Sequence, residues 1–258
     1  AVSATSDFKS MADSLRESVR ATLRVGTIQD PESIRLGPFV RGLATSQKNT
    51  EVFLRYGMSD DVLAQIGRCE LDVGYYVDAA PAESPVFTAP SERTIEDGKF
   101  QLMPLIRYDY HVIAPAEWRD KVMGKDWADL AGLPWLATPH HSAHRRLLDD
   151  VFRPMGMLPK RVAFTDQEDA MIDFVESGIC LCLARDCILE RAASKGKFVI
   201  ADKLTLTCEL SFACLKARRH EPLITNAFAA MRAVWDLKPL NAVPAPVAAA
   251  GPQKRAMR

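Results

Sequence analysis

The sequence predicts an α/β protein built from two similar units. Stretches of apolar and β-branched residues alternate with amphipathic helical stretches along most of the chain. This alternation occurs twice, and a polar stretch at residues 78–98 separates the two occurrences. The 258 residues exceed the usual size of one domain, and a hydrophobic content of 48% is enough for an ordinary globular core. These features predict one large domain or two lobes that share a hinge.

The first unit is predicted to contain three strands and two helices. In chain order these are a strand at residues 22–28, a helix at 34–44, a strand at 50–57, a helix at 59–70 and a strand at 71–77. Strands that alternate with helices favour βαβ crossovers, so we expect a largely parallel sheet. Ahead of this unit, residues 6–20 carry Phe8, Met11, Leu15 and Val19 at helical spacing and predict an amphipathic helix.

The second unit begins with residues 100–115, an alternating and aromatic-rich stretch that is typical of a strand. Its further predicted elements are a strand within residues 129–138, a helix at 145–156, a strand at 161–165, a helix at 166–178 and a strand at 179–184. A strand at residues 209–217 and a helix at 221–237 follow, and the pattern alone assigns them to neither unit. Residues 239–258 are rich in Pro and Ala, and we expect them to be disordered.

The composition limits the class of protein. Lys plus Arg equals Asp plus Glu, at 33 each, so no overall charge directs the chain towards nucleic acid or a membrane. The six cysteines show no regular spacing and lie mostly in apolar stretches, which favours buried, reduced and inert thiols. No stretch approaches the length of uncharged apolar sequence that spans a bilayer, and the start lacks a secretion signal. We therefore expect a soluble cytoplasmic protein with no membrane partner.

Five stretches, in this order, resemble the effector-binding region of LysR-type transcriptional regulators. They are "LRVGTI", "LRYGMSDDVLAQIGRCELDVGYY", "LMPLIRYDYHVIAPAEW", "WADLAGLPWLAT" and "DQEDAMIDFVESGICLCLA". The resemblance covers residues 23–237, and the order and spacing make it more specific than any single motif. Departures from the family pattern are the insert at 78–98 and four residues where the family is usually Gly-rich and ends in Pro, namely Cys180, Cys182, Ala184 and Arg185.

The resemblance implies two Rossmann-like lobes of the periplasmic-binding-protein type II, joined by two crossover strands, with a small-molecule cleft between them. It divides the chain into the end of a linker helix at residues 1–20, lobe I at 21–105 and 206–238, lobe II at 106–205, and a disordered tail at 239–258. It also implies a winged helix-turn-helix ahead of the linker helix. We therefore expect promoter DNA to be contacted only through an N-terminal domain that is absent from this chain.

The function that the resemblance implies is ligand sensing in a bacterial transcription regulator. A small organic effector, anionic or aromatic, would bind between the lobes and change the geometry of a homodimer or homotetramer, and so control DNA binding and transcription. The helices at residues 34–44 and 221–237 are candidate dimer surfaces. We expect no enzyme activity and no cofactor. The alternative is a free-standing solute-binding protein on the same two-lobe plan, which would need an export signal.

The candidate ligand-binding residues lie where strands end and helices begin. In α/β sheets, ligands collect outside the carboxyl ends of the strands, where helix N-termini present unpaired N–H groups. The candidates at four such helix starts are Thr27, Ile28, Gln29 and Ser33, then Gly57, Met58 and Ser59, then His140, His141, Ser142 and Arg145, and finally Thr165 and Asp166. Tyr108 and Cys208 are candidates on the crossover strands. The alternative for the Ser and Thr residues is that they only cap their own helices.

The stretch "TPHHSAHRR" places three histidines and two arginines at one helix start. A metal site would need a third ligand beside His140 and His144, and no CxxC or HxxxC element lies nearby, so we expect no metal. Ser142 and His144 lie two residues apart, which is typical of a helix cap with a neighbour rather than of a nucleophile with its base. Two interpretations stay open: solvated surface histidines, or recognition of a carboxylate or phenolate by His140, His141 and Arg145.

Overall fold

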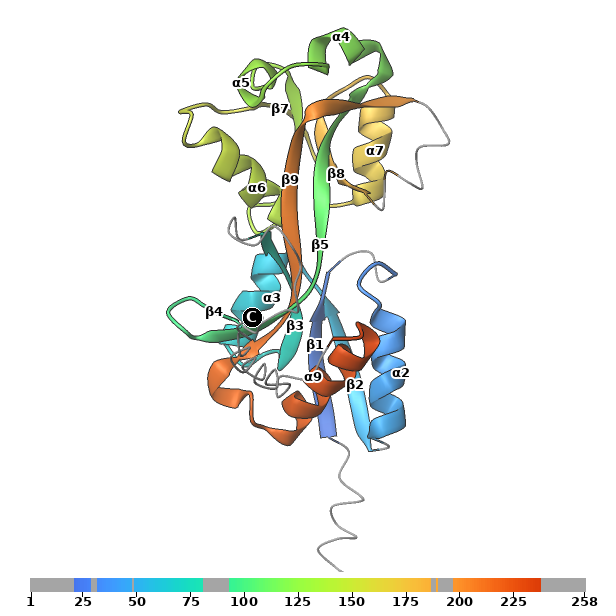
Figure 1. The fold of residues 1–258 in the computed structure, drawn as a ribbon, viewed down its shortest axis with the longest axis vertical. Helices are drawn as coiled ribbons and strands as arrows, with labels where there is room; N and C mark the ends of the chain where they lie inside the picture. Colours follow the sequence, from blue (N-terminus) through green and yellow to red (C-terminus); the bar gives the residue numbers. More distant parts are fainter. Residues whose placement is uncertain are drawn as a thin grey trace, which may run out of the picture.

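The computed structural model describes residues 21–28, 32–47, 49–80, 93–186, 189 and 197–237. These residues form two lobes joined by two long strands, β5 (Phe100–Pro115) and β9 (Phe198–Leu215), as Figure 1 shows. The predicted two-lobe α/β fold is therefore confirmed. The helix predicted at residues 6–20 and the tail at 239–258 lie outside the described residues.

Lobe I holds most of the larger sheet. Its strands are β1 (Ala21–Thr27), β2 (Thr50–Tyr56), β3 (Val73–Ala79) and β4 (Arg93–Ile95), and its helices are α2 (Leu36–Ser46), α3 (Ser59–Gly67), η3 (Lys216–Arg218) and α9 (Pro222–Val234). The strand order is β2-β1-β3-β9-β5-β4. Because α9 packs against α2, the last helix of the described residues belongs to this lobe.

In the described residues, lobe II has a smaller sheet than lobe I and more short helices. Its strands are β6 (Pro134–Ala137), β7 (Lys160–Phe164) and β8 (Cys182–Arg185), and its helices are η1 (Ala116–Trp118), α4 (Arg119–Val122), α5 (Trp127–Leu130), α6 (Ala143–Phe152) and α7 (Glu168–Glu176). The buried Trp135 packs on Trp127 and Phe152, and its indole N–H donates to the carbonyl of Leu130 at 2.8 Å. Among the described residues, no helix is long and apolar enough to cross a membrane.

The prediction of a parallel sheet is confirmed for the three strands of the first unit, but it does not hold for the strands that connect the lobes. In the described part of the chain, β1 pairs in parallel with β2 and β3, and β6 with β7. By contrast, β9 runs antiparallel to β3 and to β5, and β4 and β8 run antiparallel to β5. The chain crosses between the lobes twice, and the returning strand β9 inserts between β3 and β5. In lobe I, β9 is buried without a break from Cys208 to Cys214, which is the pattern typical of a parallel strand, so the sequence does not reveal its antiparallel direction.

Two glycines allow α3 to lie close to the sheet. A Cβ added at Gly26 or at Gly74 would lie 2.4 Å from Cγ1 of Val62, which is far below a van der Waals contact. Val62 is fully buried and fills the space that the two glycines leave. This packing holds the start of α3 beside the ends of β1 and β3, where Ser59 Oγ accepts a hydrogen bond from the backbone N–H of Val77 at 2.7 Å.

Asp72 links β1 to the chain that follows β9. Its carboxylate accepts hydrogen bonds from the backbone and guanidinium of Arg24 at 2.7 to 3.0 Å, and from the guanidinium of Arg218 at 2.9 Å. Burial alone would raise the pKa of Asp72, but the hydrogen bonds from Arg24 and Arg218 outweigh it and hold the pKa below its usual value. The carboxylate is therefore ionised in the folded protein at neutral pH.

Between the lobes, β5 and β9 form a two-stranded ribbon, defined here as residues 106–111 and 205–210. These residues pair in continuous antiparallel register. The register shifts at both ends of the ribbon, beside Leu105 and beside Val112. Such irregularities bend the strands that carry them, so the connection between the lobes has two bends at defined places.

The two faces of the ribbon differ in chemistry. On one face, directly opposed side chains are hydrogen bonded across the strands: Arg107 to Glu209 at 3.3 Å, Thr207 to Asp109 at 2.7 Å, and Thr205 with His111 at 3.3 Å. On the other face, Tyr108 and Tyr110 lie side by side with their ring centroids 5.6 Å apart. Cross-strand pairs of this kind stiffen the ribbon between its bends.

Candidate ligand-binding site

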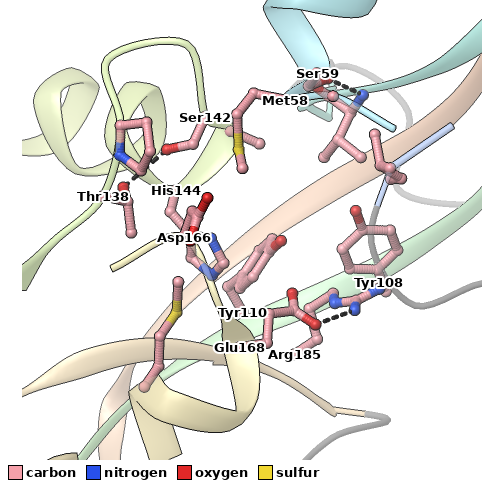
Figure 2. A pocket seen from close by; sticks show the side chains of 16 residues that line it. Met58, Ser59, Tyr108, Tyr110, Thr138, Ser142, His144, Asp166, Glu168 and Arg185 are labelled. Carbon is pink, nitrogen blue, oxygen red and sulfur yellow. Dashed lines mark hydrogen bonds and ion pairs between the residues drawn. The ribbon is translucent and has the colours of Figure 1, made fainter. Parts of the chain in front are cut away.

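A pocket lies between the lobes beside the tyrosine face of the ribbon, as Figure 2 shows. The hollow has a volume of about 540 Å³ when the solvent at its open side is counted with it. Its lining residues are Ile28, Gly57, Met58, Ser59 and Val77 from lobe I, Tyr108 and Tyr110 from β5, and Thr138, Pro139, Ser142, Ala143, His144, Asp166, Glu168, Met171 and Arg185 from lobe II. The starts of α3, α6 and α7 all reach it, so three helix N-termini meet at one cavity.

The two tyrosines form an aromatic side of the pocket. The ring of Tyr110 contacts that of Tyr108 and, at a centroid distance of 4.6 Å, the ring of His144. Burial raises the pKa of both phenols, so the hydroxyls stay protonated at neutral pH. The pair offers a ligand flat apolar surface together with hydroxyl groups.

An ion pair between Arg185 and Glu168 lies at the base of the pocket. Arg185 ends β8 and Glu168 begins α7, and the guanidinium nitrogen lies 2.6 Å from the carboxylate oxygen. The side chains are 5% and 20% exposed. Burial alone would lower the pKa of Arg185, but the Glu168 carboxylate outweighs it and raises the pKa above its usual value. Arg185 also lies over the ring of Tyr108, with 5.8 Å from the guanidinium carbon to the centroid, so this charge is fixed beside the aromatic side.

The lobe II wall is built by the start of α6. Ser142 is the N-cap, and its hydroxyl accepts a hydrogen bond from the backbone N–H of Arg145 at 3.1 Å. The hydroxyl of Thr138 lies 2.8 Å from that of Ser142. His144 is buried in the first turn of the helix, and burial lowers its pKa to about 4. Its imidazole is therefore neutral at physiological pH.

The lobe I wall is built by the start of α3. Ser59 does not cap this helix, because its hydroxyl bonds both the N–H and the carbonyl of Val77 on β3. The N-cap position is Met58, which has no side-chain cap. Gly57 lies between β2 and α3, and a Cβ there would make ordinary contacts at 3.5 Å or more, so neither space nor backbone angle requires glycine.

One residue of lobe II reaches across to lobe I. The guanidinium of Arg146 bonds the carboxylate of Asp60 and the carbonyl of Val77, and its Nε lies 3.5 Å from the carboxylate of Asp78. It also lies over the ring of Tyr76 at 5.3 Å. These contacts join α6 to α3 and β3 at the side of the pocket, and we refer to them as the interlobe clasp.

A family model for the LysR substrate binding domain matches residues 16–236. The chain belongs to the LysR substrate binding domain family. Domains of this family are the ligand-sensing parts of LysR-type transcriptional regulators, which confirms the resemblance noted in the sequence.

Solved structures of LysR-type regulatory domains share the fold of this LysR substrate binding domain. The effector binding domain of QuiR, in complex with shikimate, has a TM-score of 0.62 and 13% identity over 84% of this chain and 98% of its own. The regulatory domain of CcmR from Synechocystis PCC6803, in complex with 2-PG, has a TM-score of 0.62 and 14% identity over 83% and 97%. MetR from N. meningitidis has a TM-score of 0.60 and 15% identity over 83% and 93%. A comparison with curated proteins finds no match.

The structure of this LysR substrate binding domain brings together about half of the residues predicted from the sequence. Those that line the pocket are Ile28, Gly57, Met58, Ser59, Tyr108, Ser142 and Asp166. Ser33 lines a second cavity that shares Tyr108 and Arg185 with the first. Thr27 is fully buried, with its hydroxyl 3.2 Å from the Ile28 carbonyl, and Thr165 bonds the backbone N–H of Gln167. Gln29 lies outside the described residues.

His140, His141 and Arg145 do not line the pocket. Both histidines are exposed on the loop before α6. This agrees with the expected helix start near Ser142, which places residues 140 and 141 ahead of the helix. Arg145 bonds Asp149 on the next turn of the same helix at 2.7 Å. The described residues contain no group of three or more His, Cys, Asp or Glu side chains that could hold a metal ion.

The buried thiols have little nucleophilic character. Cys208 pairs in register with Tyr108 but is fully buried, and burial raises its pKa to about 12. Burial also raises the pKa of Cys180 to about 11 and the pKa of Cys182 well above its usual value. These thiols are protonated at neutral pH and are therefore poorly reactive.

The candidate ligand-binding residues did not include three residues that contribute to the charge and polarity of the pocket: His144, Glu168 and Arg185. A signal for Arg185 was present, since a charged residue directly follows the apolar stretch "ICLCLA" and so lies at a strand end. Glu168 lies in the first turn of a predicted helix, where an acidic residue is common and attracts no attention. Only the fold shows that these two charges meet.

Proposed function

We propose that a small organic effector binds in the pocket between the lobes and changes the angle between them. The observation that carries this proposal is that lobe I, lobe II and the connecting ribbon all line one pocket. A ligand that contacts both lobes binds the closed arrangement better than an open one and so shifts the population towards closure. In this proposal lobe I comprises residues 21–105 and 206–238, and lobe II comprises residues 106–205.

The chemistry of the lining supports an effector with a flat or apolar part. Tyr108, Tyr110 and Met58 offer apolar surface, and the hydroxyls of Ser59 and Thr138 offer polar contacts on opposite sides. The QuiR and CcmR domains were solved with shikimate and 2-PG, which supports a small organic molecule as the class of ligand here.

We propose binding rather than catalysis at this site. The hydroxyl of Ser142 is engaged by the backbone N–H of Arg145 and by Thr138, and the imidazole of His144 packs on Tyr110. Ser142 therefore serves as a helix cap and not as a nucleophile activated by His144. The five described cysteines are all free thiols, which supports our proposal that the protein works in the reducing cytoplasm.

We further propose that a homodimer or homotetramer transmits the change in angle to N-terminal DNA-binding domains. Two end strands support contact between copies: β2 exposes Phe53 and Tyr56, and β7 exposes Val162 and Phe164. Apolar side chains on an end strand favour contact with another chain. Because β2 belongs to lobe I and β7 to lobe II, an antiparallel pair of copies would cover both strands. Sedimentation velocity tests this: Phe164→Glu is expected to shift the chain towards monomer, and Asp150→Lys on exposed α6 surface is not.

The effector proposal is tested by thermal unfolding with a panel of small organic acids, amines and amino acids. Met58→Trp places a larger side chain in the pocket, so it is expected to abolish the stabilisation that any ligand gives the parent protein. The control is the double variant His141→Ala, Arg145→Ala, which changes residues outside the pocket and is expected to keep the stabilisation. Ligands that stabilise Met58→Trp as well as the parent would contradict the proposed site. Small-angle scattering should show a smaller radius of gyration when a stabilising ligand is present.

A further inference from the structure

The charges at the pocket argue for a particular class of ligand. Among the described residues that line it, three side chains are charged at neutral pH: Asp166, Glu168 and Arg185. Two are carboxylates and one is a guanidinium, so the lining carries a formal charge of minus one. His144 adds no positive charge, because burial lowers its pKa to about 4.

The positive charges near the pocket are already paired with carboxylates of the protein. Arg185 bonds Glu168 at 2.6 Å, Arg145 bonds Asp149 at 2.7 Å, and Arg146 is held by Asp60 and Asp78 in the interlobe clasp. An anionic ligand at Arg185 would lie against Glu168, and the two like charges would repel each other in a partly buried site.

The helix N-termini do not reverse this balance. The first turn of α3 carries Asp60 and Asp61, and the first turn of α7 carries Glu168 and Asp169. These carboxylates compensate the positive ends of their own helices. α6 has no acidic residue in its first turn, but the hydroxyl of Ser142 caps it.

We infer that the pocket takes a small molecule with a protonated amine, which pairs with Asp166 while its apolar part lies on Tyr108 and Tyr110. Glu168 stays paired with Arg185 and keeps the lining negative overall. The inference rests on the proposed function and names the chemical class of its effector. Asp166 is exposed at the pocket. Among the described residues its carboxylate accepts one side-chain hydrogen bond, from Gln167 at 3.2 Å, so it has capacity for an ammonium group. The electron-rich faces of the two tyrosines also favour a cation beside them.

The sequence led us to expect an anionic or aromatic effector, and the inferred class differs from the anionic one of these two. That expectation depended on His140, His141 and Arg145, and none of the three lines the pocket. A carboxylate elsewhere on the ligand is compatible with the inference, provided that the ligand also carries the amine.

The test compares ligands that differ only in the amine. Dissociation constants are measured by calorimetry for matched pairs, and the first pair is phenylalanine and 3-phenylpropanoate. 2-Phenylethylamine, which carries the amine but no carboxylate, is measured beside them. The amine-bearing member of a pair is expected to bind at least about tenfold more tightly, the size of one charge-assisted hydrogen bond. Asp166→Asn, an exposed change that leaves the core intact, is expected to weaken amine binding about tenfold. Glu168→Gln is expected to reduce the difference within each pair.

The matched control is Asp169→Asn, because Asp169 lies in the same turn of α7 but does not line the pocket. This variant is expected to leave the dissociation constants within about twofold of those of the parent protein. Amine-free acids that bind as tightly as their partners, with Met58→Trp abolishing their binding, would overturn the inference and leave the proposed function standing. If a ligand of any chemical class binds Met58→Trp as tightly as it binds the parent protein, the proposed site is wrong. The proposed function and the inference about the amine would then both fail.

Discussion

The guanidinium of Arg146, on α6 of lobe II, bonds the carboxylate of Asp60, on α3 of lobe I. The same guanidinium bonds the carbonyl of Val77, so one side chain is attached to both the helix and the strand that bound the pocket in lobe I. Nearby, the backbone N–H of Asp60 donates to the carbonyl of His141 at 3.2 Å. The lobes are thus held together beside the pocket by contacts that do not involve a ligand.

Arg146→Met should open the lobes. The variant removes the charged hydrogen bonds and leaves Asp60 and Asp78, about a third exposed, free to be hydrated. We expect a loss of about 1 to 3 kcal/mol in the free energy of unfolding and an increase in the radius of gyration measured by small-angle scattering. Arg153→Met is the control, because that guanidinium is 79% exposed and, among the described residues, forms an ion pair with Asp149 of the same helix at 3.7 Å. Equal radii for the two variants would show that the clasp does not hold the lobes.

His144 should make the protein less stable as the pH falls from about 6.5 to about 4. Burial lowers the pKa of the folded imidazole to about 4, whereas the unfolded chain takes up the proton near 6.5. The unfolded state therefore binds more protons in this window, and the free energy of unfolding should decline by about 3 kcal/mol across it. His144→Gln should remove this decline, and His141→Gln on the exposed loop should not. Urea titrations at half-unit pH intervals measure the difference.

Asp72 should govern stability at lower pH. Its folded pKa lies below the unfolded value, so its contribution is complete above about pH 4 and is lost as the pH falls through the folded pKa. Asp72→Asn should lower the free energy of unfolding at pH 7 by about 3 kcal/mol, since it removes the buried partner of Arg24 and Arg218. The variant should also lose less unfolding free energy than the parent protein as the pH falls below about 4. Glu70→Gln, which alters an exposed pair with Arg68, is expected to change neither quantity noticeably.

Gly26→Ala should destabilise lobe I by about 1 to 3 kcal/mol, because the added methyl overlaps Val62. Val62→Ala alone should also destabilise, since it leaves a cavity beneath α3. In the double variant the added methyl occupies space that Val62 vacates, so its cost should be less than the sum of the single costs. A double-mutant cycle from denaturant unfolding measures the coupling, and strict additivity would refute the close approach of α3 to the sheet.

The sequence predicted the elements of the fold well because each carries its own local signal. The strand expected at residues 100–115 matches β5, and the helix start expected near Ser142 matches the N-cap of α6. Both depend on side-chain periodicity and capping, which act over a few residues. The direction of β9 between β3 and β5 depends on contacts far apart in the chain, and no local pattern specifies it.

The site was harder to predict because neighbouring residues on a helix point in different directions. Arg145 and Arg146 are adjacent, but consecutive helical residues differ by about 100° around the axis. Arg145 turns to Asp149 on its own helix, whereas Arg146 turns to Asp60 in the other lobe. The two arginines are the same residue type at neighbouring positions, so the sequence does not tell which one reaches the other lobe. The position of α3 was needed to identify Arg146 as that residue. The pairing of Arg185 with Glu168 was hidden because the two residues lie on a strand and on a helix, 17 positions apart in the sequence, and only the fold brings them together.

Tyr108 and Tyr110 belong at once to the pocket and to the ribbon that connects the lobes. In the proposed site, a bound molecule would contact the strand that bends, so a change at the pocket would reach the connection between the lobes without passing through either core. Substitutions in the cores, around Phe212 or Trp135, should change how much of the protein is folded, while the response of each folded molecule to its effector stays the same.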